Sequence, residues 1–330
     1  MTLARNTILI GDAETTLATI PSQSVDMVLT SPPYFRLRDY GVAGQFGLES
    51  DVTQWVAQLQ SVTAELARIL VPTGSLWLNL GDSFAKHQRE GAAPKSLLLA
   101  PERLALALID DGWILRNKIV WAKTNPLPSS AVDRLTCTWE HIYIFTRQPR
   151  YYFDLDAIRR PHTSRPPRRR PGVRRGHVET WRPAGSDDSG LDAMHARGIQ
   201  GHKLGKNPGD LWRISTSNYR GAHHATFPIT LAKQAIQAGC PARRCASCRS
   251  PWRRGPLRTL SGKPRLGHIA PTCDCGGAVE RGLVLDPFFG AGSSGIAAAE
   301  LERDWLGIEL NPSFAAIAGT RLSAQATAQR

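Results

Sequence analysis

Apolar positions in the first 150 residues of the chain follow two patterns. Short strand-like segments rich in apolar residues lie at residues 7–10, 25–30, 75–80, around 113–121 and at 141–147. Helical periods cover residues 54–70 and 97–110, the first gathering Trp55, Leu59, Val62, Leu66 and Ile69 on one face, with Gly74 as the expected break before the next strand. Strands separated by helices predict an α/β fold with a mostly parallel sheet and helices on both faces.

This regular pattern is interrupted twice after residue 150. Residues 159–182 hold nine arginines and one acidic residue, Glu179, without an apolar period, and residues 240–277 hold most of the cysteines. Around these inserts, the regular pattern resumes near Asp210 and predicts strands at 282–286 and 305–308, a helix near 293–302 and a final helix. We therefore divide the chain into 1–150, a basic insert at 151–209, and 210–330 with a small insert at 240–277.

Charge and hydropathy narrow the class of protein. The 330 residues carry 41 Lys and Arg against 28 Asp and Glu, a net charge of +13, which favours a polyanionic partner. No stretch reaches 18 apolar residues, and the first 12 residues lack the apolar core of a signal peptide. We expect no membrane partner and a cytoplasmic location.

A glycine-rich turn follows the strand that ends at Asp286. Gly290, Gly292 and Gly295 fit the dinucleotide-binding spacing, and Glu309 stands 19 residues after Gly290, where a carboxylate can bind ribose hydroxyls. A structural turn without a ligand is the alternative. Only 40 residues follow Gly290, room for about one β-α-β unit, so the other strands must come from the N-terminal half. This permuted order is unusual for an NAD-dependent dehydrogenase.

A second polar turn, Ser31-Pro32-Pro33-Tyr34, follows the strand at 25–30. The two prolines have no N–H, so the local carbonyls and the Ser31 hydroxyl are free to accept hydrogen bonds from a ligand. Tyr34 adds a rigid aromatic face, on which a planar base can stack. Such a site suits an exocyclic amine, whose nitrogen becomes nucleophilic when its protons are held by acceptors. A rigid turn without chemistry is the alternative.

The two turns, in this order, resemble the S-adenosylmethionine-dependent amino-group DNA methyltransferases of the β arrangement. In that family the catalytic motif comes first, a target-recognition region next and the cofactor motif last. Further stretches that resemble family segments are Gly11-Asp12, residues 77–83, residues 125–130 with Asp133-Arg134, residues 139–145, and Ala225-Thr226-Phe227-Pro228. The resemblance spans most of residues 7–150 and 208–320 and fails across the arginine-rich insert.

The resemblance implies a Rossmann-like methyltransferase sheet in permuted order and assigns roles residue by residue. The catalytic residues would be Ser31, Pro32, Pro33 and Tyr34. The residues that bind S-adenosylmethionine would be Asp12, Phe227, Asp286, Phe289, Gly290, Gly292 and Glu309. Residues 1–150 would be the catalytic half, 151–209 the target-recognition insert and 210–330 the cofactor-binding half.

Substrate and partners follow from the same resemblance. In this family Ser-Pro-Pro-Tyr usually accompanies N4-cytosine methylation of flipped bases in double-stranded DNA, and N6-adenine methylation is the alternative. A methyltransferase acting on RNA or a small molecule, and an inactive zinc-containing DNA-binding protein, stay open as other readings. Cytosine-5 methylation needs a cysteine nucleophile, and Cys137 is expected to be a strand-edge residue instead. The resemblance also allows a cognate restriction endonuclease as partner, in a prokaryotic or phage-encoded system.

Four cysteines of the second insert have the spacing of a metal site. Cys245 and Cys248 form a C-x-x-C pair, and Cys273 and Cys275 a C-x-C pair, which together match a tetrahedral structural zinc. Unliganded thiols are the alternative. Cys240 is expected to be an ordinary packed residue.

Overall fold

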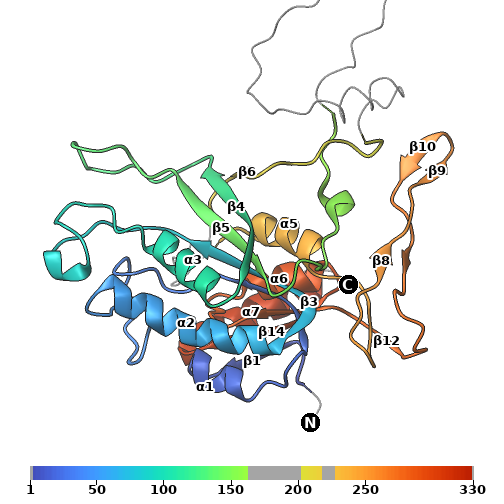
Figure 1. Ribbon diagram of the computed structural model, residues 1–330, viewed down its shortest axis with the longest axis horizontal. Helices are drawn as coiled ribbons and strands as arrows, with labels where there is room; N and C mark the ends of the chain where they lie inside the picture. Colours follow the sequence, from blue (N-terminus) through green and yellow to red (C-terminus); the bar gives the residue numbers. More distant parts are fainter. Residues whose placement is uncertain (1–2, 163–201, 218–226, 329–330) are drawn as a thin grey trace, which may run out of the picture.

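The computed structural model describes residues 3–162, 202–217 and 227–328, in which one eight-stranded sheet has the order β1-β14-β13-β2-β3-β5-β4-β6 (Figure 1). Its strands are β1 (Thr7–Ile10), β2 (Val25–Thr30), β3 (Leu70–Leu80), β4 (Ile114–Lys123), β5 (Trp139–Thr146), β6 (Leu211–Ile214), β13 (Leu283–Asp286) and β14 (Asp304–Glu309). Only β5 runs against its neighbours, β3 and β4, and the other pairings are parallel. The expected mostly parallel α/β sheet is confirmed.

The last two strands of the sheet lie between the first two. Leu285 of β13 pairs with Val28 of β2, and Ile308 of β14 pairs with Leu9 of β1. All four strands are parallel, so their carboxyl ends meet at one edge of the sheet. In an open α/β sheet, ligands bind at this edge.

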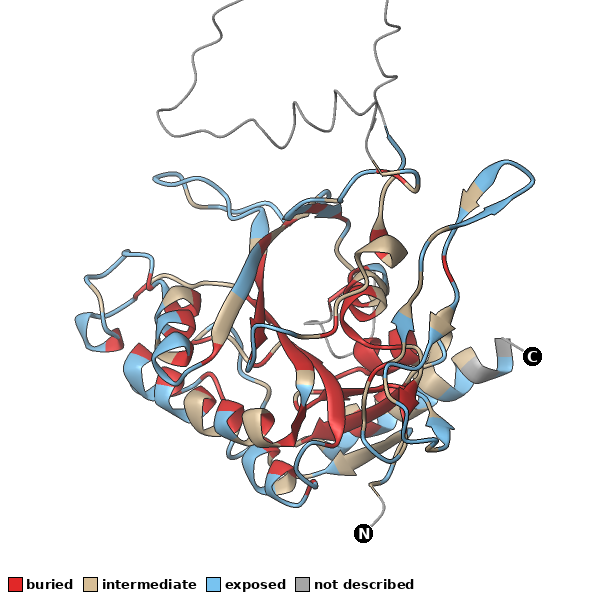
Figure 2. Cartoon of the chain, turned by 45° about the vertical axis from the view of Figure 1, so that its right-hand side comes forward, coloured by how far each residue is buried: buried red, intermediate tan, exposed pale blue. Residues whose placement is uncertain are grey.

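Helices cover both faces of the sheet, and each face has its own core. On one face pack α1 (Ala13–Ala18), α2 (Val52–Ile69) and α3 (Ala100–Asp110), which contribute Leu17, Trp55 and Leu104 to a buried cluster. On the other pack α5 (Ile229–Gly239), α6 (Ser293–Glu300) and α7 (Pro312–Ala328), with Leu231 and Ala297 buried. Figure 2 shows the central strands in red between these layers, as apolar burial requires.

The end of α2 differs from the boundary predicted at Gly74. Asp51 caps α2 by accepting from the N–H groups of Thr53 and Gln54, and the helix ends at Ile69, well before Gly74. Gly74 instead lies inside β3, where a Cβ would stand 2.9 Å from the Asp26 carbonyl. The expectation that Gly74 breaks the helix was wrong. Glycine is needed there for the close approach of two strands.

The start of α3 also departs from the expected position 97. Leu99 has a left-handed backbone (φ 53°), and a proline stands within the first two helical positions, so the helix begins at Ala100. Proline favours the first turn because its missing N–H needs no partner there.

The small insert forms a separate group of short strand pairs. These are β7 (Arg244–Cys245) with β12 (Val279–Glu280), β8 (Arg253–Arg254) with β11 (Ile269–Ala270), and β9 (Arg258–Leu260) with β10 (Lys263–Arg265). Figure 1 shows the β9–β10 hairpin projecting from the body. The sequence predicts that this insert ends at residue 277. In the structure it extends to Glu280, because β12 pairs with β7.

Two single helical turns, η1 (Gln88–Glu90) and η2 (Leu155–Ile158), complete the described secondary structure. Within the described residues, no helix is both long and apolar enough to cross a membrane.

Candidate active site

Two hollows at the carboxyl ends of the central strands share one wall. The first is lined from the ends of β1, β13 and β14 and by the loop after Tyr34; the second is lined from the ends of β2, β3 and β4 and by the start of β5. Ser31, Tyr40 and Phe227 line both. A group bound in one hollow therefore faces a group bound in the other across Ser31. We refer to them as the cofactor hollow and the base hollow.

Glu309 anchors the glycine-rich turn at the floor of the cofactor hollow. Its Oε2 accepts from the Gly290 N–H at 2.7 Å, and its Oε1 accepts from the Asn311 N–H at 2.8 Å. Burial raises the pKa of Glu309. Each oxygen keeps a further lone pair, so this carboxylate can accept from a ribose diol in the hollow. Gly290 and Glu309, which are 19 residues apart in the sequence, are thus in direct hydrogen-bond contact.

Asp286 lines the cofactor hollow, but its oxygens are engaged within the protein. They accept from the Thr30 hydroxyl at 2.6 Å, the Ser294 hydroxyl at 2.6 Å and the Phe288 N–H at 3.1 Å. Burial raises the pKa of Asp286 to about 6, while the hydrogen bonds from Ser294 and Thr30 oppose the shift. These bonds tie the ends of β2 and β13 together, so the structure gives Asp286 a part in holding the turn.

Two further residues expected at the cofactor, Phe289 and Gly292, help to shape the glycine-rich turn. The Phe289 ring stacks on Trp305 with centroids 5.4 Å apart, and a Cβ at Gly307 would stand 2.4 Å from that ring. Gly292 caps α6 with φ 76° and lies against Ala318, outside the lining of the hollow. Phe289 and Asp12 both line the hollow, and Asp12 also caps α1.

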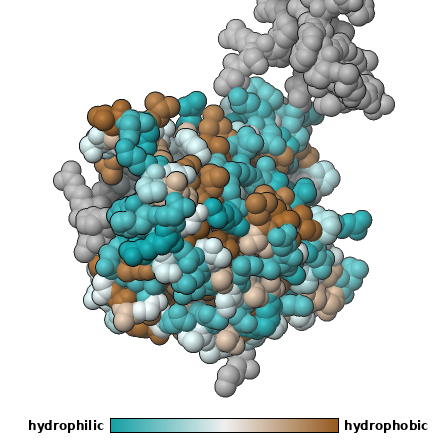
Figure 3. Space-filling view, turned by 60° about the vertical axis from the view of Figure 1, so that its left-hand side comes forward, coloured by the Kyte–Doolittle hydropathy of each residue, from teal (hydrophilic) through white to brown (hydrophobic). Residues whose placement is uncertain are grey.

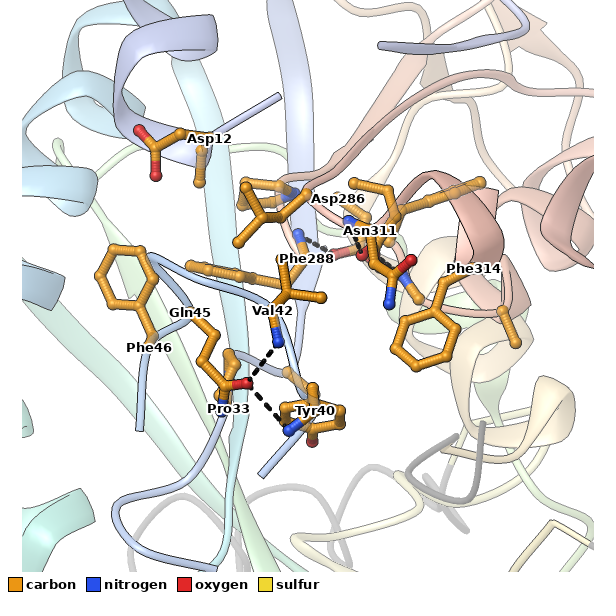
Figure 4. Close-up of a pocket in the computed structure, with 18 of the residues that line it drawn as sticks. Asp12, Pro33, Tyr40, Val42, Gln45, Phe46, Asp286, Phe288, Asn311 and Phe314 are labelled. Carbon is orange, nitrogen blue, oxygen red and sulfur yellow. Dashed lines mark hydrogen bonds between the residues drawn. The ribbon is translucent and has the colours of Figure 1, made fainter. Parts of the chain in front are cut away.

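The loop after Tyr34 supplies a wall of the cofactor hollow that sequence reasoning missed. Figure 4 shows Tyr40, Val42, Gln45 and Phe46 gathered around it, with Asp286, Asn311 and Phe314 from the C-terminal strands and helix. Gln45 Oε1 accepts from the Tyr40 and Val42 N–H groups at 2.9 and 3.3 Å. The Phe46 ring meets Phe288 edge to face at 5.4 Å. The loop has no apolar period, and its aromatic residues Phe35, Tyr40 and Phe46 were the only available signal.

The Ser31-Pro32-Pro33-Tyr34 turn forms the boundary between the hollows. The Trp55 indole N–H donates to the Pro33 carbonyl at 3.0 Å and fixes the turn on α2. The Tyr34 ring lies against Gly81, where a Cβ would approach it to 2.7 Å. Burial and the neighbouring Glu140 carboxylate raise the pKa of Tyr34 well above its usual value, so Tyr34 stays a neutral phenol.

Three polar residues of the base hollow were not singled out from the sequence. Glu140 accepts from Tyr34 Oη at 2.9 Å, from Asn79 Nδ2 at 3.1 Å and from Lys123 Nζ at 2.5 Å. Asn79 and Glu140 lie within stretches that resembled family segments, which was the available signal. Lys123 carried none.

Cys137 also lines the base hollow, two residues before β5 begins. It is exposed, and Arg134 lies 3.9 Å from its sulfur. The expectation of a strand-edge position is close to this placement, although the residue precedes the strand.

The four cysteines expected to bind metal lie together at the other end of the sheet. The Sγ atoms of Cys245, Cys248, Cys273 and Cys275 all lie within 4.8 Å of one another. They belong to the insert that Arg244 attaches to Ser24 and Asp26 at the start of β2. Asp26 and Ser31 are five residues apart in extended chain, about 16 Å at the rise of a β-strand. Cys240 is buried at the end of α5, as expected.

Part of the expected binding apparatus lies outside the described residues. Residues 163–201, which include most of the arginine-rich insert, and Ala225-Thr226 are in this category. Arg159 and Arg160 are described, and Arg159 pairs with Asp156 at 2.6 Å.

Comparison with known proteins identifies the class. The family profile described as DNA methylase, of the N6/N4 type, matches residues 25–319, and the chain belongs to this family. The protein is therefore a DNA methyltransferase, and the expected resemblance is confirmed.

Individual relatives are type II methyltransferases. The chain is 32% identical to M.Cfr9I of Citrobacter freundii over 97% of its own length and 89% of that protein, and 31% identical to M.SmaI of Serratia marcescens over 96% and 90%. Its fold is similar to the cytosine-N4-specific PvuII DNA methyltransferase (TM-score 0.60, 19% identity, 97% and 87% of the two chains). It is also similar to a Thermus thermophilus protein complexed with S-adenosyl-L-methionine (TM-score 0.54, 21% identity, 97% and 93%).

Proposed function

We propose that this DNA methyltransferase transfers a methyl group from S-adenosylmethionine to the exocyclic N4 of a cytosine flipped out of double-stranded DNA. The observation that carries the proposal is the position of Ser31, which lines both hollows. A flipped base must leave the stack to reach a pocket of this kind. The methyl donor and the amine would then meet beside one hydroxyl.

The cofactor hollow fits an adenosine-containing group. Aromatic rings of Phe46, Phe288 and Phe314 offer faces for a planar base, and Glu309 and Asp12 offer carboxylates for hydroxyl or amino groups. When bound, S-adenosylmethionine supplies an electrophilic methyl on a sulfonium. The Thermus thermophilus protein, similar in fold, binds the same molecule, which supports the assignment.

The choice of N4-cytosine over N6-adenine depends on Ser31. A neutral hydroxyl heads the Pro-Pro-Tyr turn, and the PvuII enzyme of similar fold is named cytosine-N4-specific. The runner-up, N6-adenine methylation, uses the same amine chemistry. An inactive DNA-binding protein is disfavoured because Ser31, Tyr34 and Glu309 all stand at the two hollows.

The product identifies the base directly. DNA methylated by the purified protein is digested to nucleosides, and the modified base is identified by mass spectrometry. N4-methylcytosine supports the proposal, and N6-methyladenine supports the alternative, N6-adenine methylation. 5-Methylcytosine contradicts the mechanism, and unmodified DNA supports the inactive reading.

Glu309→Ala should weaken S-adenosylmethionine binding by about 1–3 kcal/mol, the range for hydrogen bonds to a charged group. The substitution removes the diol acceptor and also releases the Gly290 and Asn311 N–H groups. Calorimetric titration measures the change. Glu302→Ala, on an exposed turn after α6, is the control and should leave affinity unaltered. Equal affinity in Glu309→Ala would remove Glu309 from the binding site.

We also propose that Cys245, Cys248, Cys273 and Cys275 bind one structural zinc ion. The Sγ–Sγ distances are 3.1 Å for Cys245–Cys275, 3.4 Å for Cys273–Cys275 and 3.5 Å for Cys248–Cys275. Zinc–thiolate bonds of about 2.3 Å in a tetrahedron require about 3.8 Å, so a small expansion admits the ion. The site has no place in the methyl transfer.

One zinc per chain is therefore expected in the purified protein. Cys248→Ser should lower the zinc content and the unfolding temperature, because metal binding contributes to folding of the insert. Elemental analysis and thermal unfolding measure both effects, with Cys137→Ser as the control. Metal-free protein after purification without chelator would contradict the zinc site.

The remaining assignments concern the DNA. We assign residues 1–150 to the catalytic half, 151–209 to target recognition and 210–330 to the cofactor-binding half. Arginine suits phosphate contacts, which supports the basic insert as the DNA-binding element. Leu127, Val132 and Leu135 are exposed on the loop between β4 and β5, and Leu127 lines the base hollow. Figure 3 shows groups of hydrophobic side chains exposed on the surface of the turned molecule. The type II relatives support a cognate restriction endonuclease as a cellular partner.

A further inference from the structure

A hydrogen-bond chain connects Ser31 to a carboxylate at the start of β5. Ser31 Oγ donates to Tyr34 Oη at 3.0 Å, and Tyr34 Oη donates to Glu140 Oε2 at 2.9 Å. Asn79 Nδ2 donates to the same carboxylate oxygen at 3.1 Å, and Lys123 Nζ donates to the other at 2.5 Å. Three separate segments of the chain, which contain Tyr34, Asn79 and Lys123, thus converge on Glu140.

The carboxylate decides the direction of every bond in this chain. An ionised carboxylate accepts only, so the Tyr34 hydrogen must point at Glu140. Tyr34 Oη then has only lone pairs left for Ser31, and the Ser31 hydrogen points at Tyr34. The Ser31 lone pairs are left free on the side of the two hollows, where an amine proton would arrive.

We propose that Glu140 is a positioning residue that orients the Ser31 hydroxyl through Tyr34 and receives, through the same two hydroxyls, the proton that the target amine loses. The inference rests on the proposed function, because it concerns the amine of that reaction. It does not depend on whether the amine belongs to cytosine or adenine.

The proton balance closes over this chain. A bond forms between the amine nitrogen and the methyl carbon, while the carbon–sulfur bond breaks and its electron pair stays on sulfur. The nitrogen is then cationic and acidic, because it regains conjugation with the ring by losing a proton. That proton passes to Ser31 Oγ, the Ser31 proton to Tyr34 Oη, and the Tyr34 proton to Glu140 Oε2. Both hydroxyls end with one hydrogen each, and the carboxylate ends neutral.

The surroundings favour this assignment. Burial and Glu140 raise the pKa of Tyr34 well above its usual value, so the phenol keeps the hydrogen that the relay needs. Lys123 binds Oε1 and leaves Oε2 to Tyr34 and Asn79. The other titratable groups that line this hollow are Arg38, Tyr40 and Cys137.

The test uses Glu140→Gln and Tyr34→Phe in the full-length protein. Methyl transfer is measured in single turnover on preformed complexes with DNA and S-adenosylmethionine, because product release limits many steady-state rates. Each variant should transfer methyl about 10²-fold more slowly, the lower range for a proton-transfer group. The double variant should be no slower than the slower single, because both changes cut one chain. Affinities for DNA and S-adenosylmethionine should stay within about threefold of wild type, since neither change removes a binding surface.

A ligand-free measurement checks the same contact. Ultraviolet difference titration follows Tyr34 ionisation, with Tyr34→Phe as the subtraction reference. Glu140→Gln should lower the pKa of Tyr34, because it removes the neighbouring negative charge. If Glu140→Gln does not fold, Tyr34→Phe, which removes one oxygen atom, carries the rate test.

The chain contains a matched control on the opposite face of β5. Tyr143 Oη donates to Glu102 Oε1 at 3.1 Å, and Lys118 Nζ donates to the same carboxylate oxygen at 2.5 Å. None of these three residues lines either hollow. Glu102→Gln and Tyr143→Phe should therefore transfer methyl at the wild-type rate.

The outcomes separate the two proposals. A wild-type protein that modifies no DNA contradicts the proposed function before any variant is compared. Active wild-type protein with Glu140→Gln or Tyr34→Phe within twofold of its rate overturns the relay alone. Losses that multiply in the double variant, or that appear equally in Glu102→Gln, also overturn it.

Discussion

Ser31→Ala should slow methyl transfer by about 10²- to 10³-fold, as removal of one preorganised hydrogen-bonding group does in other enzymes. The alanine has no acceptor for the amine proton at the boundary between the hollows. S-adenosylmethionine affinity should stay within a few-fold, because Glu309 and the aromatic wall are untouched. Single-turnover rates and calorimetric titration measure the two quantities.

Neighbouring substitutions sharpen this expectation. Tyr34→Ala should also cut turnover strongly, because it removes the stacking face, worth about 1–3 kcal/mol, and the partner of the Ser31 hydroxyl. Ser83→Ala is the matched serine control, since Ser83 Oγ donates to the Phe35 carbonyl and lines neither hollow. A Ser31→Ala rate close to wild type would contradict the catalytic assignment. Ser31→Asp restores an acceptor and tests whether preference moves toward adenine.

Arg244→Ala should destabilise the fold by about 3–5 kcal/mol, the cost of leaving a buried charge without its partner. Arg244 is fully buried, and its guanidinium donates to Asp26 and Glu280, each at 2.7 Å, and to the Ser24 carbonyl at 2.9 Å. Chemical denaturation at pH 8 measures the loss.

The same variant should show a characteristic pH dependence. Burial already raises the pKa of Asp26 to about 6, against the opposing charge of Arg244, and removing Arg244 raises it further. A carboxyl with a raised pKa in the folded state stabilises below its unfolded pKa and loses that effect as pH rises. Arg244→Ala should therefore be less destabilised at pH 5 than at pH 8.

Arg5 supplies the control for the buried pair. It contacts Glu280 at 2.5 Å and Asp304 at 2.8 Å while staying about a fifth exposed. Partly exposed ion pairs contribute about 0–1 kcal/mol, so Arg5→Ala should cost little. Equal losses for Arg5→Ala and Arg244→Ala would show that burial does not set the energy of this network.

Local sequence signals predicted most elements of the fold. The runs at 7–10 and 25–30 coincide with β1 and β2, and all five apolar residues expected on the helix at 54–70 are buried in α2. These predictions succeeded because the spacing of apolar residues along an element indicates directly which of its sides faces the core. Boundaries at Gly74 and Leu99 were misplaced because close strand contact and a left-handed backbone depend on neighbours far along the chain.

The site residues that belong to short sequence motifs were predicted, and those brought to the site only by packing were missed. Ser31, Glu309 and the cysteine set were named from spacing, and the structure brings each set together. Lys123 and the Tyr40–Phe46 wall were missed, because an isolated lysine or aromatic loop residue has many uses. Asp286 and Phe289 were named as cofactor contacts; both line the cofactor hollow, and both side chains also hold the turn through contacts within the protein.

The sequence by itself determined the class of protein, the two turns that carry its chemistry and the four thiols of the insert. Each of these is a short-range pattern, readable from adjacent residues. Only the tertiary structure decided that β13 and β14 lie between β1 and β2, which brings Ser31 and Glu309, 278 positions apart, to the cofactor hollow. It also decided that Tyr34 connects Ser31 to Glu140. Strand order and side-chain hydrogen bonds are set by packing between distant segments, which no local pattern encodes.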